Sequence, residues 1–267
     1  MKFIRIATIA ALSSTILAGG AAAVSAQETR EANTYGNVQF RSSGVEDGPI
    51  TVIPPEVDPG VEINPEVPGT TGPLSIAKAA HMNFGSQVIS NQDQTYNMVA
   101  EIATLANPEE DGPTKVPYVS FAQVQDTRGT NAGWDLQVSL SDFKSNTRNN
   151  VLTGAEIEFV DSRIQYEGTN TENSPSAHTP GLTLLPNGAA RSVMTAAQGQ
   201  GTGVSSVVWG NQADLTAQFE AEGFDPETDV VENNAIQLSI PGSTAKDSTT
   251  YTSTLTWELT STPGNEV

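Results

Sequence analysis

The chain has 267 residues, and its 31 acidic residues outnumber its 12 lysines and arginines, which gives a formal net charge of −19 at pH 7. Nucleic acids, anionic membranes and polyphosphates are bound through clustered basic side chains, so this charge argues against all three as partners. The chain has no cysteine. A disulfide framework, a lipid-modified cysteine, thiol catalysis and cysteine-based metal sites are therefore excluded.

Residues 1–26 are predicted to be a secretory signal peptide. Lys2 and Arg5 provide a positive start, residues 6–24 are apolar, and residues 24–26 are the small residues of a cleavage site. A membrane-spanning interpretation competes, because the apolar stretch is nearly long enough to cross a bilayer, but the cleavage pattern favours removal. Removal takes two of the 12 basic residues and no acid, so 10 would face 31 acidic ones, a formal charge of −21.

Residues 27–71 are predicted to form a polar and proline-rich N-terminal spacer. A short strand is expected at 35–40, and the chain then carries six prolines between residues 50 and 74. Proline at this density fixes φ and removes backbone donors, which favours an extended segment over sheet or helix. We expect either a semi-rigid stalk or a segment laid along the domain that follows.

From residue 72 onward, short runs of Val, Ile, Thr and aromatic residues alternate with Gly, Pro, Asn and Asp. This spacing predicts an all-β fold. We expect one antiparallel, β-sandwich-like domain with long loops over residues 72–267, and one short helix at 212–224. The expected strands are 74–78, 95–102, 117–125, 134–140, 155–166, 192–196, 204–209, 235–240 and 250–260.

Two stretches, GWDLQVSL and LTWELTST, each carry tryptophan, one residue and then leucine. Alternate side chains of a strand point to opposite faces, so Trp134 shares a face with Leu136, and Trp257 with Leu259. Polar residues fill the other face, which predicts half-buried antiparallel strands. Two interpretations stay open: core packing with each indole N–H bonded to a nearby carbonyl, or an aromatic shelf that stacks on a sugar or a partner protein.

Further stretches accompany these two motifs in a fixed order. They are GPLSI (72–76), MNFGSQVIS (82–90), QDTRGT (125–130), AIQLSIPG (235–242) and YTSTLTWELTSTP (251–263). A single Trp-x-Leu carries no information, but two in this order with an Asp-Thr-Arg-Gly turn make a specific signature. Over residues 72–267 the chain resembles the WxL-domain surface proteins of low-GC Gram-positive bacteria.

The resemblance implies a secreted protein that is held non-covalently on the cell wall, with peptidoglycan as its ligand. It also implies companion surface proteins from the same locus, one of them membrane-anchored, in a complex linked to adhesion, with host extracellular ligands as further partners. The chain shows no C-terminal hydrophobic tail preceded by a sorting motif, which also favours non-covalent retention. The alternative is that the main ligand is the membrane-anchored companion and not peptidoglycan.

The turn VQDTRGTNAGW joins two expected strands. Asp126 and Arg128 are predicted to pair across it and fix the hairpin, because Asp and Gly are ordinary turn residues. The alternative is that Arg128, with Lys144 and Arg148 nearby in the sequence, donates hydrogen bonds to a carboxylate of the ligand. Asp126 and Arg128 therefore join Trp134, Leu136, Trp257 and Leu259 as candidate binding residues.

Candidates for catalysis are few, and we expect a protein that is not an enzyme and uses no cofactor. The chain has two histidines, His81 and His178. Glu156 and Glu158 would share one face of a strand, and a wall glycosidase requires two carboxylates that lie close together. Paired acids on an acidic protein are usually only solvated.

A metal site is not expected either. Asp225, Glu227 and Asp229 lie close together in FDPETDVVEN, and a calcium ion binds oxygen ligands of this kind. The stretch lacks the spacing of an EF-hand loop, so it carries no metal prediction.

Overall fold

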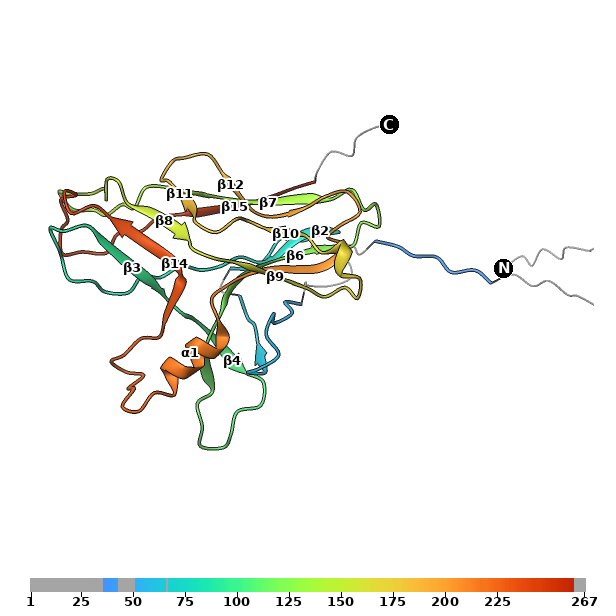
Figure 1. The fold of residues 1–267 in the computed structure, drawn as a ribbon, viewed down its shortest axis with the longest axis horizontal. Coiled ribbons are helices and arrows are strands. Elements are labelled where there is room, and N and C mark those ends of the chain that lie inside the picture. The colour runs from blue at the N-terminus through green and yellow to red at the C-terminus, as the bar shows by residue number, and fades with distance from the viewer. Residues whose placement is uncertain (1–35, 43–50, 66, 262–267) are drawn as a thin grey trace, which may run out of the picture. The chain divides into compact units, whose positions relative to one another are not determined.

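The computed structural model describes residues 36–42, 51–65 and 67–261 (Figure 1). Contacts divide the chain into two units, Met1–Gln39 and Phe40–Val267. The fold described below is that of the second unit. The predicted signal peptide lies outside the described residues. Within the described part, no helix is long and apolar enough to cross a membrane.

The described chain is almost entirely β, with 15 strands, one α-helix and a short 3₁₀ turn at Thr171–Asn173. All pairings between strands are antiparallel and form four small sheets. The sheet with both Trp-x-Leu stretches, here called the motif sheet, consists of β10 (Ser176–Ala177), β12 (Arg191–Ala196), β7 (Trp134–Leu140) and β15 (Leu255–Ser261). The all-β prediction is confirmed.

The other three sheets are named after one of their strands. The β14 sheet has the order β11 (Leu182–Leu184), β8 (Glu156–Phe159), β14 (Glu232–Ile240) and β3 (Gln94–Val99). The β13 sheet has the order β2 (Leu74–Lys78), β6 (Ser120–Asp126), β13 (Gly203–Trp209) and β9 (Arg163–Tyr166). The β4 sheet has the order β1 (Val61–Glu62), β4 (Glu101–Leu105) and β5 (Lys115–Tyr118).

Three of the predicted strands are broken in two. The run 95–102 ends at Ala100, whose N–H donates to Val231 O, and the chain then enters the β4 sheet. The run 117–125 is broken at Val119, whose N–H donates to the side chain of Gln212. In both places a residue distant in the chain accepts the backbone hydrogen bond, and the chain leaves one sheet and continues in the next. The run 155–166 is interrupted at residues 160–162, which belong to no strand.

Two hydrophobic cores hold the sheets together. The main core contains inward side chains of the motif sheet, the β14 sheet and the β13 sheet, including Trp134, Ile236 and Val207. Figure 1 shows β7, β12 and β15 as a layer that lies apart from β6 and β9. The second core lies on the other face of the β13 sheet, where Phe121 and Val208 pack with the β4 sheet and the helix.

Part of the proline-rich spacer lies along the domain. The side-chain amide of Gln123 bonds the backbone of Ile53 in both directions, with distances of 3.0 and 2.7 Å. Val52 and Val61 are buried in the second core, and β1 pairs with β4. Of the two expected arrangements, residues 51–63 thus adopt the one along the domain, while the division of the chain after residue 71 stays a prediction. No strand forms at residues 36–40.

The single described α-helix, α1 (Gln212–Phe219), follows β13 and is shorter than predicted. It begins because the side chain of Asn211 accepts hydrogen bonds from the N–H groups of Ala213 and Asp214. The residues beyond Phe219 form turns, one of them closed by the N–H of Phe224 on Ala221 O. In Figure 1, α1 lies with β4 on the side of the fold away from β7, β12 and β15.

Candidate functional site

The structure brings the two Trp-x-Leu motifs together on neighbouring strands. β7 and β15 pair in a register that sets Leu136 opposite Leu259 and Trp257 opposite Val138. Trp134 lies at the other end of the pairing, opposite Ser261. The two motifs therefore run antiparallel past a shared leucine pair, with one tryptophan on each side of it. All four candidate residues occupy the same face of the motif sheet.

The two motifs differ in burial. Trp134 and Leu136 are both 0 % exposed, and the Trp134 indole N–H donates to Gly201 O at 3.0 Å. Trp257 and Leu259 lie on the edge strand β15 and are only partly buried against the main core. The first motif thus packs as the core interpretation predicts, while the side chains of the second motif remain partly exposed to solvent.

An aromatic cluster joins the second motif to the middle of the fold. The ring of Trp257 lies 6.2 Å from that of Trp209, which lies 4.7 Å from Phe159. The Trp209 indole N–H donates to His178 Nε2 at 2.9 Å, and His178 Nδ1 donates to Thr179 O at 2.7 Å. Both bonds form together only with a neutral imidazole. Burial lowers the pKa of His178, which also favours the neutral form.

The polar face of the motif sheet is organised by Asp135, the middle residue of the first motif. Its carboxylate accepts hydrogen bonds at 2.9 Å from the hydroxyls of Ser192 and Thr195 on β12, and another from Gln137. Glu258, the middle residue of the second motif, lies opposite Gln137 and is exposed. The middle residues therefore lie on the face that solvent reaches.

Asp126 and Arg128 pair across their turn. The guanidinium binds both carboxylate oxygens, at 3.0 and 2.8 Å, and donates a further bond to Gly133 O. Asp126 is buried, and its hydrogen bond raises the pKa of Arg128. The predicted ion pair across the turn is present. It uses the guanidinium donors of Arg128 that the alternative interpretation assigns to a ligand carboxylate. Lys144, the second cation of that alternative, is paired with Asp142 at 3.3 Å.

The residues weighed for catalysis are partly exposed, and those weighed for calcium lie in an exposed turn. Glu156 and Glu158 share the more exposed face of β8. Asp225 accepts a hydrogen bond from the N–H of Glu227, while Asp229 accepts one from the N–H of Asp225, so both carboxylates close a turn. Among the described residues, no three His, Cys, Asp or Glu side chains are grouped so that they could hold a metal ion.

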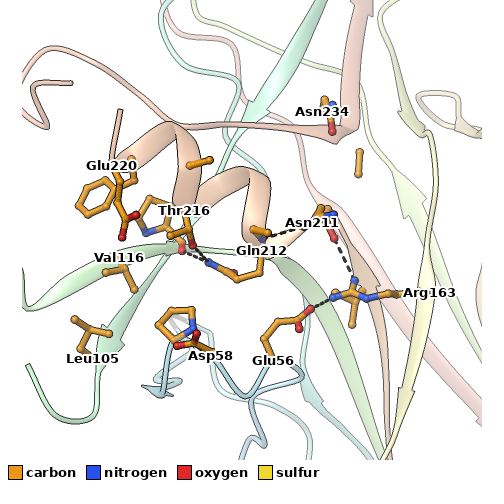
Figure 2. Close-up of a pocket in the computed structure, with 18 of the residues that line it drawn as sticks. Glu56, Asp58, Leu105, Val116, Arg163, Asn211, Gln212, Thr216, Glu220 and Asn234 are labelled. Atoms are coloured by element: carbon orange, nitrogen blue, oxygen red, sulfur yellow. Dashed lines mark hydrogen bonds and ion pairs between the residues drawn. The ribbon is translucent and has the colours of Figure 1, made fainter. Parts of the chain in front are cut away.

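A cavity of about 1250 Å³ lies beneath α1, and sequence reasoning missed it (Figure 2). The helix, the end of the β4–β5 hairpin, the segment 160–163 and the spacer residues Glu56, Asp58 and Pro59 line it, and it is partly open to solvent. Glu56 and Arg163 form an ion pair across one end, and Arg163 also donates to Gly210 O at 3.1 Å. The wall residues are far apart in the chain, so no local pattern marks them.

The chain matches a family model described as "WxL domain surface cell wall-binding" over residues 27–263. It belongs to the WxL family. The match covers nearly the whole chain and confirms the resemblance. It includes the spacer residues 51–63 that pack along the WxL domain. No curated protein and no solved structure is significantly similar. The family is one of cell-wall-binding surface domains and not of enzymes, which supports attachment to the wall and a cell-surface location.

Proposed function

We propose that this WxL protein is secreted after removal of residues 1–26 and attaches non-covalently to the peptidoglycan of a Gram-positive wall, without catalysing a reaction. The main support for this proposal is the family match, which spans residues 27–263. The acidic charge favours neutral sugar and peptide contacts over the anionic polymers of a wall.

Of the two motifs, only the second has a tryptophan and a leucine with exposed surface that could contact the wall directly. Trp134 and Leu136 have no exposed surface to offer a ligand. Trp257 and Leu259 keep some, at the edge of the motif sheet. We propose that both motifs act mainly by building the sheet, and that any direct contact with the wall is limited to the surface that the second motif leaves exposed. Asp126 and Arg128 would contribute only what their own ion pair leaves free.

We further propose a sandwich-like arrangement for the domain. It is supported by the main core, which contains side chains of the motif sheet, the β14 sheet and the β13 sheet. Two layers that share one core are the usual solution for sheets with one apolar face. The polar face of the motif sheet would then be an outer surface.

Co-sedimentation tests the proposed ligand. The chain from residue 27 onward should sediment with isolated peptidoglycan from which wall polyphosphates have been stripped. A chain that stays in the supernatant across salt and divalent-ion conditions would show that direct wall binding is wrong. Soluble fragments released from the same peptidoglycan would contradict the absence of catalysis.

A second candidate is a subunit of an adhesion-linked surface complex whose main ligand is a membrane-anchored companion, with host ligands beyond it. The cavity beneath α1 favours it, because a space of this size would admit a segment of another protein. Retention on the surface would then vanish in cells that lack the companion although their peptidoglycan is unchanged. Under the first proposal, retention would persist in those cells.

A further inference from the structure

We propose that residues 36–42 of one copy of this chain pair, as an added strand, with the outer edge of β15 in a second copy. The pairing involves the edge of the motif sheet and does not depend on which wall ligand the protein binds. Three features support it: an edge strand without an outer neighbour, an exposed segment of the same length, and a matching order of apolar and charged side chains.

The outer edge of β15 has no strand partner in the described part of the chain. β15 has seven residues, is the longest described strand at a sheet edge, and pairs with β7 alone. Natural proteins block such edges with proline, lysine or a bulge. β15 contains neither proline nor lysine, and its pairing with β7 has no register shift. Its outer N–H and C=O groups are therefore a template for a further strand.

The apolar side chains of β15 show that the flank of the motif sheet is uncovered. Leu136 and Val138 on β7 are fully buried, whereas Leu259 and Trp257, which lie opposite them on β15, are only partly buried. The two pairs share one face of the sheet, but β7 has a strand on each side and β15 on one side. A further strand beside β15 would cover this flank and bury more apolar surface.

Residues 36–42 form an exposed segment with the side-chain pattern of a strand. All seven are exposed, and none lies in a strand or helix. Val38 and Phe40 are 77 % and 88 % exposed. In an extended chain these two side chains point to one side, and the polar side chains between and after them point to the other. Large apolar side chains left exposed in this alternation favour an interaction surface.

The segment and β15 match in an antiparallel pairing. Both have seven residues, so one register pairs them from end to end. In that register Val38 lies opposite Leu259 and Phe40 lies opposite Trp257, so both apolar residues of the segment meet apolar residues of β15. A register shifted by one residue would instead set apolar side chains against polar ones.

The charges of the two segments are complementary. Residues 36–42 carry one charge, on Arg41, and β15 carries one of opposite sign, on Glu258. In the end-to-end register these two residues are diagonal neighbours on the polar face, within reach of a long side chain. Two β15 strands paired with each other would contribute two Glu258 carboxylates and no cation. The added strand is therefore residues 36–42 and not a second β15.

The second copy follows from the state of the segment in one copy. A single chain leaves residues 36–42 exposed and without a strand partner. Reciprocal exchange, in which each copy donates its segment to the other, would form two such pairings and close a two-fold symmetric dimer.

Analytical ultracentrifugation of the chain from residue 27 onward tests the dimer. The parent should show a monomer–dimer equilibrium as its concentration rises. Val38→Asp with Phe40→Asp should raise the dimer dissociation constant by about a hundredfold or more, because both apolar contacts are lost in each pairing. Val67→Asp with Val88→Asp is the matched control, since these side chains are 76 % and 89 % exposed and the added charge is the same. The control should dimerise like the parent.

Hydrogen exchange locates the contact. Amides of residues 255–261 should exchange more slowly in the parent dimer than in the Val38→Asp, Phe40→Asp variant, while those of β3, at the edge of another sheet, should not differ. An excess of a capped peptide with the sequence of residues 36–42 should dissociate the dimer and protect the same amides. The proposal is overturned if the parent stays monomeric at all concentrations, if both double variants dimerise alike, or if the added protection lies outside β15. A monomer in which β15 loses protection in the variant would show pairing within one chain and would also overturn it.

Discussion

At the scale of single residues, the two tryptophans of the motifs have different structural roles. Trp134 is fully buried and hydrogen-bonded, so Trp134→Ala should lower the free energy of unfolding by about 3–5 kcal/mol. Trp257 is half-buried on an edge strand, and Trp257→Ala should cost about 1–3 kcal/mol. Urea unfolding measures both. We expect wall binding by Trp257→Ala to fall only as far as its stability does.

The opposite result has a clear meaning. A Trp257→Ala protein that melts like the parent but no longer binds wall or partner would show that the second motif is itself the binding surface. Trp257→Phe is the matched control, because it keeps an aromatic ring beside Trp209 and loses only part of the contact area. It should lie between parent and alanine variant in stability.

His178 should make the protein less stable as the pH falls. Burial lowers its pKa in the folded state, although the hydrogen bond to the backbone of Thr179 and the charge of Asp161 oppose the shift. The unfolded chain keeps a value of about 6.5. Below about pH 6.5 the unfolded chain therefore takes up the proton first, and stability that is present above that pH is lost towards the folded pKa. Urea midpoints measured from pH 7.5 to 5 should fall.

His178→Gln should remove part of this pH dependence, because glutamine does not titrate and its carbonyl can still accept from Trp209. An NMR titration in which His178 protonates at or above the ordinary value would contradict the burial effect. Protonation of His178 Nε2 would also place its new N–H opposite the Trp209 N–H and break their hydrogen bond. The Trp209 fluorescence should therefore change with the same pH midpoint as the His178 titration.

At the scale of elements, the turn before β13 depends on a glycine that touches the first motif. A Cβ on Gly201 would lie 2.5 Å from Trp134 Nε1, whereas nothing lies within 4 Å of a Cβ on Gly199. Both have positive φ, so each alanine variant has a backbone cost of about 1 kcal/mol. Gly201→Ala should cost about 2 kcal/mol more, because the indole must move. Equal urea midpoints for the two would contradict the packing described for Trp134.

The spacer offers a second prediction at this scale. A chain that begins at residue 72 would lose the buried side chains of Val52 and Val61 and the bonds from Gln123 and Tyr118. We expect it to be less stable by roughly 4 kcal/mol or more than a chain that begins at residue 40. Equal unfolding midpoints would show that the domain does start after residue 71, as the sequence predicts.

Strands were predictable where one alternating pattern runs from end to end, as in residues 134–140. The breaks at Ala100 and Val119 were not, because the groups that take their N–H bonds, Val231 and Gln212, lie more than 90 positions away in the chain. Local turn chemistry did reveal the Asp126 and Arg128 pair, since both partners lie within one turn. The cavity beneath α1 combines segments from all along the chain, so it had no local signal.

At the scale of the whole molecule, the uneven charge predicts how salt affects wall binding. With residues 1–26 removed, 10 basic residues face 31 acidic ones, so walls that retain polyphosphates should repel the protein at low ionic strength. Raising the salt to about 0.15 M shortens the screening length to about 8 Å, and binding to such walls should increase. Stripped peptidoglycan is the control and should show a smaller increase. Binding to intact walls that falls as salt rises would instead indicate attraction through a local basic patch, and the argument from net charge would fail.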